Sequence, residues 1–263
     1  MIKKIMLIAV LFIAACSADV DMTVKPGNDG FVLGNGDVAV LLTHGLGASP
    51  YEIKELSEYL SERNITVYGV RLAGHGTSWQ DLNERKWDEW YKSYSEAYLS
   101  VKPLKQKVFV GGMSLGGVLA LRLAEDQQVD GVISLAPALI LSDTRSKYAW
   151  LFKYFSPFSL RNISIEKRPY YYDRFPVASV AEAVTLSDVV EKDLSKIDEP
   201  TFIMEYTEDN RVNPISSQII YDNIASQNKQ LRWINGSGHV MIVDDDNKEK
   251  YFEEIYQFIL ANS

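Results

Sequence analysis

A serine between two glycines is the first feature of this chain that could do chemistry. Gly112, Ser114 and Gly116 form a G-x-S-x-G motif within the stretch KVFVGGMSLGGVLA at 107–120. The β-branched and aromatic residues before the motif predict a buried strand, and the apolar and small residues after it predict a helix. A serine on such a turn presents its hydroxyl as a nucleophile, and the flanking glycines allow the tight backbone. The motif is also compatible with a glycine-rich turn that has no chemistry.

A base and an acid that could activate this serine lie downstream. Asp209 follows one apolar strand pattern, and His239 follows the last one, after Gly-Ser-Gly. Because the carboxyl ends of parallel strands meet at one edge of a sheet, we expect both residues to converge on Ser114. Such an arrangement would perform nucleophilic catalysis through a Ser-His-Asp triad. Three further carboxylates compete for the role of the acid: Glu208, Asp222 and Asp244.

The elements that would position these residues are those of an α/β fold. Continuous apolar runs, typical of strands covered on both faces, alternate with helical patterns and predict a mostly parallel sheet with helices on both faces. The expected strands are 31–33, 38–43, 65–70, 108–110, 131–135, 201–205 and 231–234. The expected helices include 86–101, 115–125, 183–194, 214–224 and 248–260.

Local signals refine the ends of these elements. The residues Gly-Asn-Gly-Asp at 34–37 are typical of a hairpin turn between the first two strands. Ser49 is expected to cap the first helix, and the aspartates at 244–246 are expected to begin the last one. The glycine-rich bend His-Gly-Leu-Gly at 44–47 could direct backbone N–H groups into the crevice as an oxyanion hole. A plain strand-to-helix turn is the alternative for this bend.

The alternation of strands and helices stops at 137–180. More than forty residues without a strand pattern is long for a connection in a compact domain. We expect a helical cap inserted over the carboxyl ends of the strands. Its aromatic side chains could line an apolar pocket or simply seal the cap onto the core: Tyr148, Trp150, Phe152, Tyr154, Phe155, Phe158, Tyr170, Tyr171 and Tyr172.

Composition narrows the class of protein. The 263 residues are 46% hydrophobic, which suits one large α/β domain or two small ones with an ample core. The net charge of −8 argues against a nucleic-acid partner. The three histidines, His44, His75 and His239, show none of the short spacings of metal ligands, so no metal and no cofactor is expected. Nothing in the composition predicts an oligomeric state.

The first residues have the pattern of an export signal. Lys3 and Lys4 precede an apolar run at 5–15, which is too short for a bilayer core of about 30 Å. The run ends in Ile-Ala-Ala-Cys at 13–16, which resembles the lipobox of bacterial lipoproteins, where the cysteine is lipidated. Cys16 is the single cysteine of the chain, and this favours the interpretation as a lipidation site.

This resemblance implies three segments before and within the fold. We expect a lipoprotein signal peptide at 1–15, a polar tether at 16–30 and one domain at 31–263. The chain would be exported and anchored to the bacterial cell envelope through Cys16. Ser17 after the cysteine favours the outer membrane if the cell is Gram-negative. Ordinary secretion with cleavage after Ala18 is the alternative.

Five motifs in the domain resemble the α/β-hydrolase carboxylesterases and monoacylglycerol lipases of bacteria. They are LLTHGLG (41–47), GVRLAGHGTS (69–78), VFVGGMSLGG (108–117), PTFIMEYTEDNRVNP (200–214) and NGSGHVMIVDDD (235–246). The resemblance implies an α/β-hydrolase fold with a Ser114, Asp209 and His239 triad, and it selects Asp209 over Glu208. It also implies Leu46 and Leu115 as the oxyanion donors. His44 and His75 fall in its HG and GHG loops.

The resemblance implies a serine hydrolase that cleaves short- or medium-chain acyl esters or monoacylglycerols. Two other classes share the fold. An aminopeptidase of the prolyl-iminopeptidase type would need acidic cap residues for a substrate ammonium, and Glu166 and Asp173 are available. An inactive, lipid-anchored binding module would not need the triad residues that this chain carries.

Overall fold

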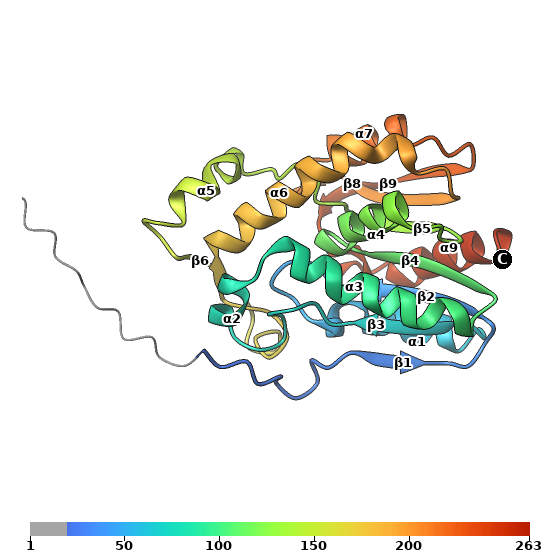
Figure 1. Cartoon of the computed structure of the whole chain (residues 1–263), viewed down its shortest axis with the longest axis horizontal. Coiled ribbons are helices and arrows are strands. Elements are labelled where there is room, and N and C mark those ends of the chain that lie inside the picture. Colours follow the sequence, from blue (N-terminus) through green and yellow to red (C-terminus); the bar gives the residue numbers. More distant parts are fainter. Residues whose placement is uncertain (1–19) are drawn as a thin grey trace, which may run out of the picture.

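A seven-stranded sheet forms the centre of the computed structural model, which describes residues 20–263 (Figure 1). The expected signal peptide and Cys16 lie outside the described residues. The strand order is β1-β3-β2-β4-β5-β8-β9, and every neighbouring pair is parallel except β1 with β3. The strands are β1 (Phe31–Leu33), β2 (Val38–Thr43), β3 (Thr66–Val70), β4 (Lys107–Met113), β5 (Val132–Leu135), β8 (Thr201–Asp209) and β9 (Lys229–Gly238).

Helices cover both faces of this sheet, as expected of the α/β-hydrolase fold. Side chains of α3, α4, α6 and α7 share one buried apolar cluster with the sheet, and those of α1, α8 and α9 share the other. Alternate residues of β2 supply the two clusters, because successive strand side chains point to opposite faces. The helices are α1 (Lys54–Ser61), α2 (Trp79–Glu84), α3 (Trp87–Val101), α4 (Leu115–Asp126), α5 (Ala149–Phe152), α6 (Val177–Asp193), α7 (Ile215–Asn223), α8 (Met241–Asp244) and α9 (Lys248–Ala261).

The hairpin expected between the first two strands was wrong. β1 pairs antiparallel with β3, because both edges of β2 are already taken by the parallel neighbours β3 and β4. The segment 34–37 instead passes close to the loop before β3. A Cβ at Gly36 would lie 1.8 Å from the carbonyl oxygen of Asn64, so only glycine fits this approach.

Two expected helix-start signals act differently in the structure. Ser49 precedes a 3₁₀ turn at Pro50–Ile53, and its side chain makes no capping hydrogen bond. The last helix, α9, begins at Lys248 as expected, but Asp244 ends the short helix α8 instead of beginning α9. The neighbouring Asp245 is engaged elsewhere, because it accepts hydrogen bonds from the Tyr206 hydroxyl and from a backbone N–H within its own loop.

The segment after β5 contains a strand pair that we did not expect. β6 (Phe158–Leu160) and β7 (Arg174–Pro176) form a two-stranded antiparallel ribbon. Each strand has only three residues, too few for a clear alternating pattern. Helix α6 begins at Val177, six residues before the expected 183. Figure 1 shows α5, β6 and the start of α6 at one end of the molecule, away from the carboxyl terminus.

The described part of the expected tether lies against the domain. The Lys25 N–H donates to the Gly76 carbonyl at 2.9 Å, and the Ser78 hydroxyl donates to the Asp21 carbonyl at 2.7 Å. The Asn28 side chain is buried and donates to the Pro169 carbonyl. Over residues 20–263, no helix has the length and apolar character needed to cross a membrane.

Candidate active site

Ser114 occupies a strained turn between β4 and α4. Its φ and ψ of 57° and −111° lie in a region that non-glycine residues rarely adopt. The Ser114 N–H donates to the Leu135 carbonyl at 2.7 Å, which ties the turn to the neighbouring strand. A Cβ at either Gly112 or Gly116 would lie 2.6 Å from the Thr43 carbonyl oxygen, so this close approach requires glycine. The local geometry holds the Ser114 side chain at the edge of the sheet.

Asp209 and His239 are in direct contact. His239 Nδ1 lies 2.6 Å from Asp209 Oδ2, and both side chains are buried. The other carboxylate oxygen, Oδ1, accepts the N–H groups of Arg211 and Val212 at 2.7 and 2.8 Å. These bonds fix the carboxylate and aim Oδ2 at the imidazole. The imidazole in turn is held with its Nδ1 toward the acid, which leaves Nε2 free for chemistry.

The strands that bring this pair together are longer than their apolar patterns. β8 runs to Asp209 and β9 to Gly238, and these two residues are register partners. The apolar sequence pattern predicts that these two strands end at 205 and 234, because the residues at 207–209 and 235–238 are polar or glycine. A bulge between Tyr206 and Glu208 shifts the register near the end. His239 therefore follows directly after the residue that pairs with Asp209.

The competing carboxylates have other partners or face solvent. Glu208 is exposed. Asp222 accepts a hydrogen bond from the Gln218 side chain on α7, and Asp244 is paired with Lys167. Of the four candidates, Asp209 is the one in contact with His239.

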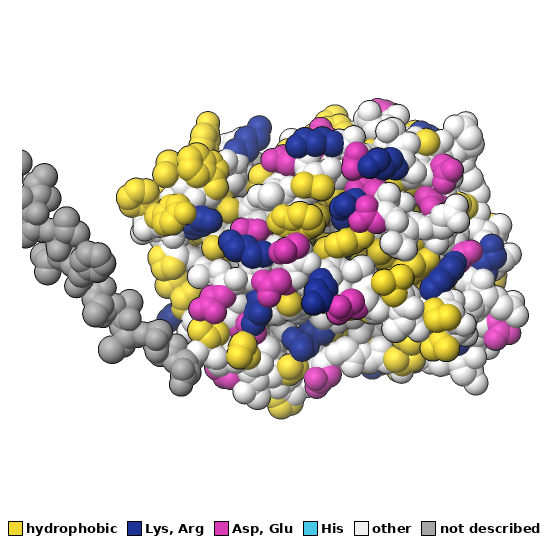
Figure 2. All heavy atoms as spheres, in the orientation of Figure 1, with side chains coloured by type: hydrophobic (Ala, Val, Ile, Leu, Met, Phe, Trp, Pro, Cys, Tyr) yellow, Lys and Arg dark blue, Asp and Glu magenta, His cyan; other side chains and the backbone are white. Residues whose placement is uncertain are grey.

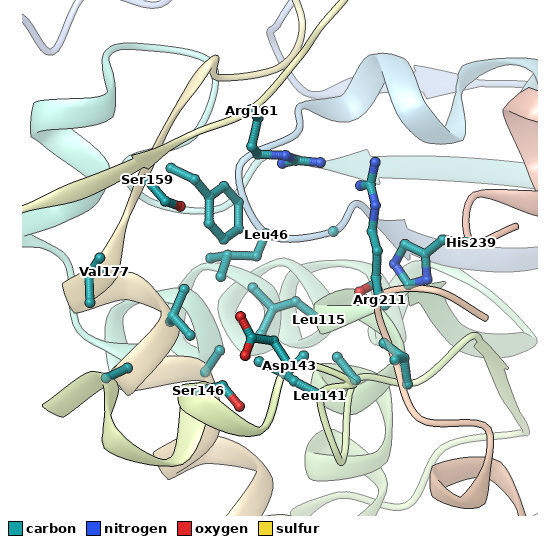
Figure 3. Close-up of a pocket in the computed structure, with 18 of the residues that line it drawn as sticks. Leu46, Leu115, Leu141, Asp143, Ser146, Ser159, Arg161, Val177, Arg211 and His239 are labelled. Carbon is teal, nitrogen blue, oxygen red and sulfur yellow. The ribbon is translucent and has the colours of Figure 1, made fainter. Parts of the chain in front are cut away.

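Ser114 and His239 line the same cavity, which has a volume of about 560 Å³. Leu46 and Leu115 line it as well, and Figure 3 shows them between His239 and the cap residue Val177. Leu115 is the first residue of α4, so its N–H has no acceptor within the helix. For the Leu46 N–H, the described residues offer no acceptor either. Both N–H groups are thus available to a ligand oxygen.

Most of the cavity wall is apolar. The apolar lining comes from the loops after β2, β5 and β8, from α4 and α6, and from the cap: Leu46, Leu115, Ala138, Leu141, Ala149, Phe152, Phe175, Val177, Val180, Ala183 and Val212. Of the nine aromatic residues singled out at 137–180, Phe152 and Tyr171 line the cavity. Several of the others are exposed around α5, where Figure 2 shows a cluster of hydrophobic side chains.

His44 and His75 join the two glycine loops beside the cavity. His44 Nε2 accepts the Leu72 N–H at 3.3 Å, so its proton lies on Nδ1, which donates to the Gly45 carbonyl at 2.9 Å. Burial lowers the pKa of His44 to about 4 and lowers that of His75 well below its ordinary value. Both rings are neutral supports of the loops. Within residues 20–263, no group of three His, Cys, Asp or Glu is arranged to hold a metal ion.

Two buried glutamates near the site escaped the sequence analysis. Glu52 lines the cavity, and its Oε2 accepts the Gly45 N–H at 2.6 Å, next to Leu46. Glu205, on β8, accepts the Ser217 hydroxyl at 3.0 Å. Burial raises the pKa of each, and the charge of nearby Asp209 raises that of Glu205 further. Glu52 lies in a helix-start pattern and Glu205 in an apolar strand pattern, so neither position shows a sequence signal of a functional residue.

Comparisons with known proteins show the family to which the chain belongs. Residues 34–246 match the family Hydrolase_4, described as serine aminopeptidase, S33. A carboxylesterase of Bacillus subtilis (strain 168) is 29% identical over 245 residues, which are 90% of this chain and 97% of that protein. A thermostable monoacylglycerol lipase of Bacillus sp. (strain H-257) is 30% identical over 229 residues, 85% of this chain and 91% of that protein.

Solved structures show the same fold. One from a report on LipS and LipT, two metagenome-derived lipolytic enzymes, superposes with a TM-score of 0.84 at 26% identity, covering 91% of this chain and all 100% of that one. The monoacylglycerol lipase of Paleococcus ferrophilus has a TM-score of 0.76 at 20% identity, over 89% of this chain and 98% of that one. The chain therefore belongs to the serine aminopeptidase S33 (Hydrolase_4) family and is a hydrolase of the α/β-hydrolase fold, similar to bacterial carboxylesterases and monoacylglycerol lipases.

Proposed function

We propose that this enzyme hydrolyses carboxylic esters with aliphatic acyl chains, short- or medium-chain acyl esters or monoacylglycerols, through Ser114, His239 and Asp209. The observation that carries the proposal is the 2.6 Å contact between Asp209 and His239 at the cavity that Ser114 lines. A buried carboxylate that fixes one imidazole nitrogen leaves the other as the base for a serine hydroxyl. The strained turn at Ser114 is the backbone that such a nucleophile requires.

The reaction follows from these positions in two halves. In the first, Ser114 Oγ attacks the ester carbonyl carbon as His239 Nε2 takes the hydroxyl proton. The Leu46 and Leu115 N–H groups donate to the carbonyl oxygen as it becomes negative. The C–O bond to the alcohol then breaks, His239 returns its proton to the leaving oxygen, and an acyl-serine remains.

The second half repeats these steps with water. His239 removes a proton from a water molecule as that water attacks the acyl carbon. The bond to Ser114 breaks, the serine takes the proton back, and the free acid leaves. Asp209 holds the His239 imidazole in place throughout and stabilises the transient imidazolium.

The walls of the cavity favour an apolar acyl group. The side chains of Leu141, Val177 and Val180 line the cavity, and Figure 3 shows Val177 on the far side of Leu46 from His239. We call this apolar part of the cavity the apolar slot. Phe152 lines the cavity and also belongs to the exposed hydrophobic cluster around α5. Esters that partition into lipid would meet an apolar surface at the entrance. The names of the two Bacillus relatives fit the same substrate class.

The family's description makes peptide cleavage the second candidate. An aminopeptidase needs a free carboxylate to hold the substrate ammonium. Glu166 and Asp173 do not line the cavity, and Asp143, which does, is paired with Arg145 at 2.7 Å. Glu52 also lines the cavity, but its Oε2 already accepts the Gly45 N–H, and burial raises the pKa of this carboxyl, which disfavours its charged form. The ester assignment is therefore the better supported of the two.

Hydrolysis of a p-nitrophenyl ester series from acetate to palmitate tests the proposal. We expect turnover that depends on Ser114, with S114A reduced to the level of a protein-free control. A matched variant is S146A, which removes another serine hydroxyl from the cavity wall. Ester turnover at the wild-type level in S114A would refute the assignment. Cleavage of amino-acid p-nitroanilides without cleavage of esters would establish the peptidase instead.

The cellular location is a separate proposal that rests on the sequence alone. We propose that the chain is exported, lipidated at Cys16 and held on the bacterial envelope, where lipid esters are abundant. Metabolic labelling with a radioactive fatty acid should mark the wild-type protein and not C16A, and fractionation should place the label in the membrane. Unlabelled, released protein beginning at residue 19 would show ordinary secretion instead.

A further inference from the structure

Two arginines from distant parts of the chain meet at the active-site cavity. Arg161 follows β6 in the cap, and Arg211 follows Asp209 after β8; both line the cavity. Figure 3 shows the Arg161 guanidinium directed toward that of Arg211, with the Arg211 side chain beside the His239 ring. Two cations brought together at a mostly apolar cavity need an explanation.

Neither guanidinium has a carboxylate or hydrogen-bond partner among the described residues. Throughout residues 20–263, no carboxylate forms an ion pair with Arg161 or Arg211, and no protein group accepts a hydrogen bond from either guanidinium. Five of the other eight arginines are paired with carboxylates: Arg63, Arg85, Arg122, Arg145 and Arg232. The remaining three have other partners, because Arg71 and Arg168 donate to backbone carbonyls and Arg174 lies over the rings of Trp79 and Phe158. A cation pair that stabilised the structure would show comparable partners.

Both arginines are nevertheless held in place by their surroundings. Arg161 stacks on the Phe175 ring, with its guanidinium carbon 4.7 Å from the ring centroid, and its backbone N–H donates to the Asp173 carbonyl. The backbone N–H of Arg211 donates to Asp209 Oδ1. The main chain is therefore fixed at both positions, and the ring also holds the Arg161 guanidinium, which lowers the entropy cost of holding a ligand.

Their mutual repulsion leaves a demand for negative charge. Burial, and then the charge of Arg211, lower the pKa of Arg161 to about 10, so both side chains are cationic at neutral pH. The carboxyl of Glu52, which also lines the cavity, offsets this in part. Its Oε2 is already bonded to the Gly45 N–H, and burial raises its pKa. An anionic ligand would meet two donors with unused hydrogen-bonding capacity.

The position of the arginines says which part of the substrate carries that charge. His239 protonates the leaving alcohol in the proposed mechanism, so the alcohol must lie on the histidine side of the cavity. Figure 3 shows the Arg211 side chain on that side, next to His239, and the Arg161 guanidinium directed toward it, whereas Val177 and the apolar slot lie on the far side of Leu46.

We infer that the preferred substrate is an acyl ester whose alcohol bears an oxyacid anion, a carboxylate or a phosphate, held by Arg161 and Arg211. The inference rests on the proposed ester hydrolysis and adds the chemical class of the alcohol. Planar guanidinium groups suit both anions because they donate two parallel hydrogen bonds to adjacent oxygens. The product alcohol would leave as the anion, and the acyl group would occupy the apolar slot.

Three octanoyl esters that differ only in the alcohol test this inference. They are 1-octanoylglycerol, 1-octanoylglycerol 3-phosphate and O-octanoyl lactate, compared by kcat/KM below their micellar concentrations. At least one anionic ester should exceed the neutral one about tenfold or more, the effect of one or two charge-assisted hydrogen bonds. Preference for the phosphate ester or for the carboxylate ester would identify which of the two anions the substrate alcohol bears. A neutral ester that outperforms both anionic ones would overturn the inference.

Variants show whether the arginines cause the preference. R161Q and R211Q should each lower the ratio of anionic to neutral kcat/KM about tenfold, and R161K should retain part of it. R168Q removes an exposed arginine of the same cap segment that does not line the cavity, and it should keep the wild-type ratio. An R168Q ratio that falls as far as that of R161Q would contradict a specific role.

A measurement on the wild-type enzyme covers the case in which a variant fails to fold. Glycerol 3-phosphate should competitively inhibit hydrolysis of p-nitrophenyl butyrate at least about tenfold more strongly than glycerol, and added salt should weaken it. Equal inhibition by the two alcohols would overturn the inference. Ser114-dependent hydrolysis without anion preference would refute this inference alone, whereas hydrolysis that survives in S114A would refute the proposed function.

Discussion

Replacing Asp209 with asparagine changes one atom of the contact with His239 and keeps the shape of the side chain. In the wild-type protein, Oδ1 accepts two backbone N–H groups and Oδ2 faces His239 Nδ1 at 2.6 Å. In D209N, the amide oxygen must stay on the backbone donors, because an NH₂ group there would face two N–H groups. The amide NH₂ then points at His239 Nδ1.

This geometry forces the wrong tautomer on the imidazole. Nδ1 must become an acceptor for the amide, so the proton moves to Nε2, the nitrogen that should receive the Ser114 proton. The same exchange in a serine protease triad costs about 10⁴-fold in kcat. We expect a loss of this order in D209N. The two backbone hydrogen bonds at Oδ1 survive, so the folded state should lose little stability.

Turnover of p-nitrophenyl butyrate and thermal unfolding measure the two effects. The matched control is E208Q, which makes the same chemical change at the adjacent, exposed carboxylate and should keep its activity. A kcat for D209N within tenfold of wild type would refute the role assigned to Asp209. A loss in E208Q equal to that in D209N would show that general charge at this loop matters, rather than the tautomer.

Three further predictions concern the groups that support the site. Burial, and then the charge of Asp209, raise the pKa of Glu205 above its ordinary 4.5, so the folded protein holds a proton that the unfolded chain releases. Stability should therefore fall as the pH rises above 4.5. E205Q should flatten this fall in thermal unfolding profiles, and an unchanged slope would contradict the raised pKa of Glu205. G116A places a Cβ 2.6 Å from the Thr43 carbonyl and should cost about 1–3 kcal/mol in urea unfolding, whereas a wild-type midpoint would show that the turn can relax. The Tyr94 hydroxyl accepts a buried N–H of β4 at 2.9 Å, so Y94F should destabilise the protein by about 1–3 kcal/mol in the same assay, and a neutral effect would point to a substitute partner.

The central part of the fold was predictable because its signals are local. The apolar run of β4, the glycines at 112 and 116 and the apolar start of α4 lie within one short stretch. Sheet order was harder to predict. Only four residues of turn type, 34–37, separate β1 from β2. β1 nevertheless pairs with β3, because β3 and β4 occupy both edges of β2.

Residues that act through long-range contacts left no local pattern. Glu52 reads as an ordinary residue near a helix start, and its role is apparent only from its bond to Gly45. Arg161 lies in a segment without periodicity and meets Arg211 from across the cavity. The ribbon of β6 and β7 was missed for a related reason, because three-residue strands are defined by their partner rather than by their own sequence.

The most direct test of the central claim is to trap the nucleophile. The wild-type enzyme is treated with a fluorophosphonate, which reacts with activated serines, and the modified peptide is identified by mass spectrometry. We expect a single adduct, on Ser114, with labelling strongly slowed in H239A because the base that removes the hydroxyl proton is gone. An adduct on a different serine, or ester hydrolysis that continues in fully labelled enzyme, would contradict the account.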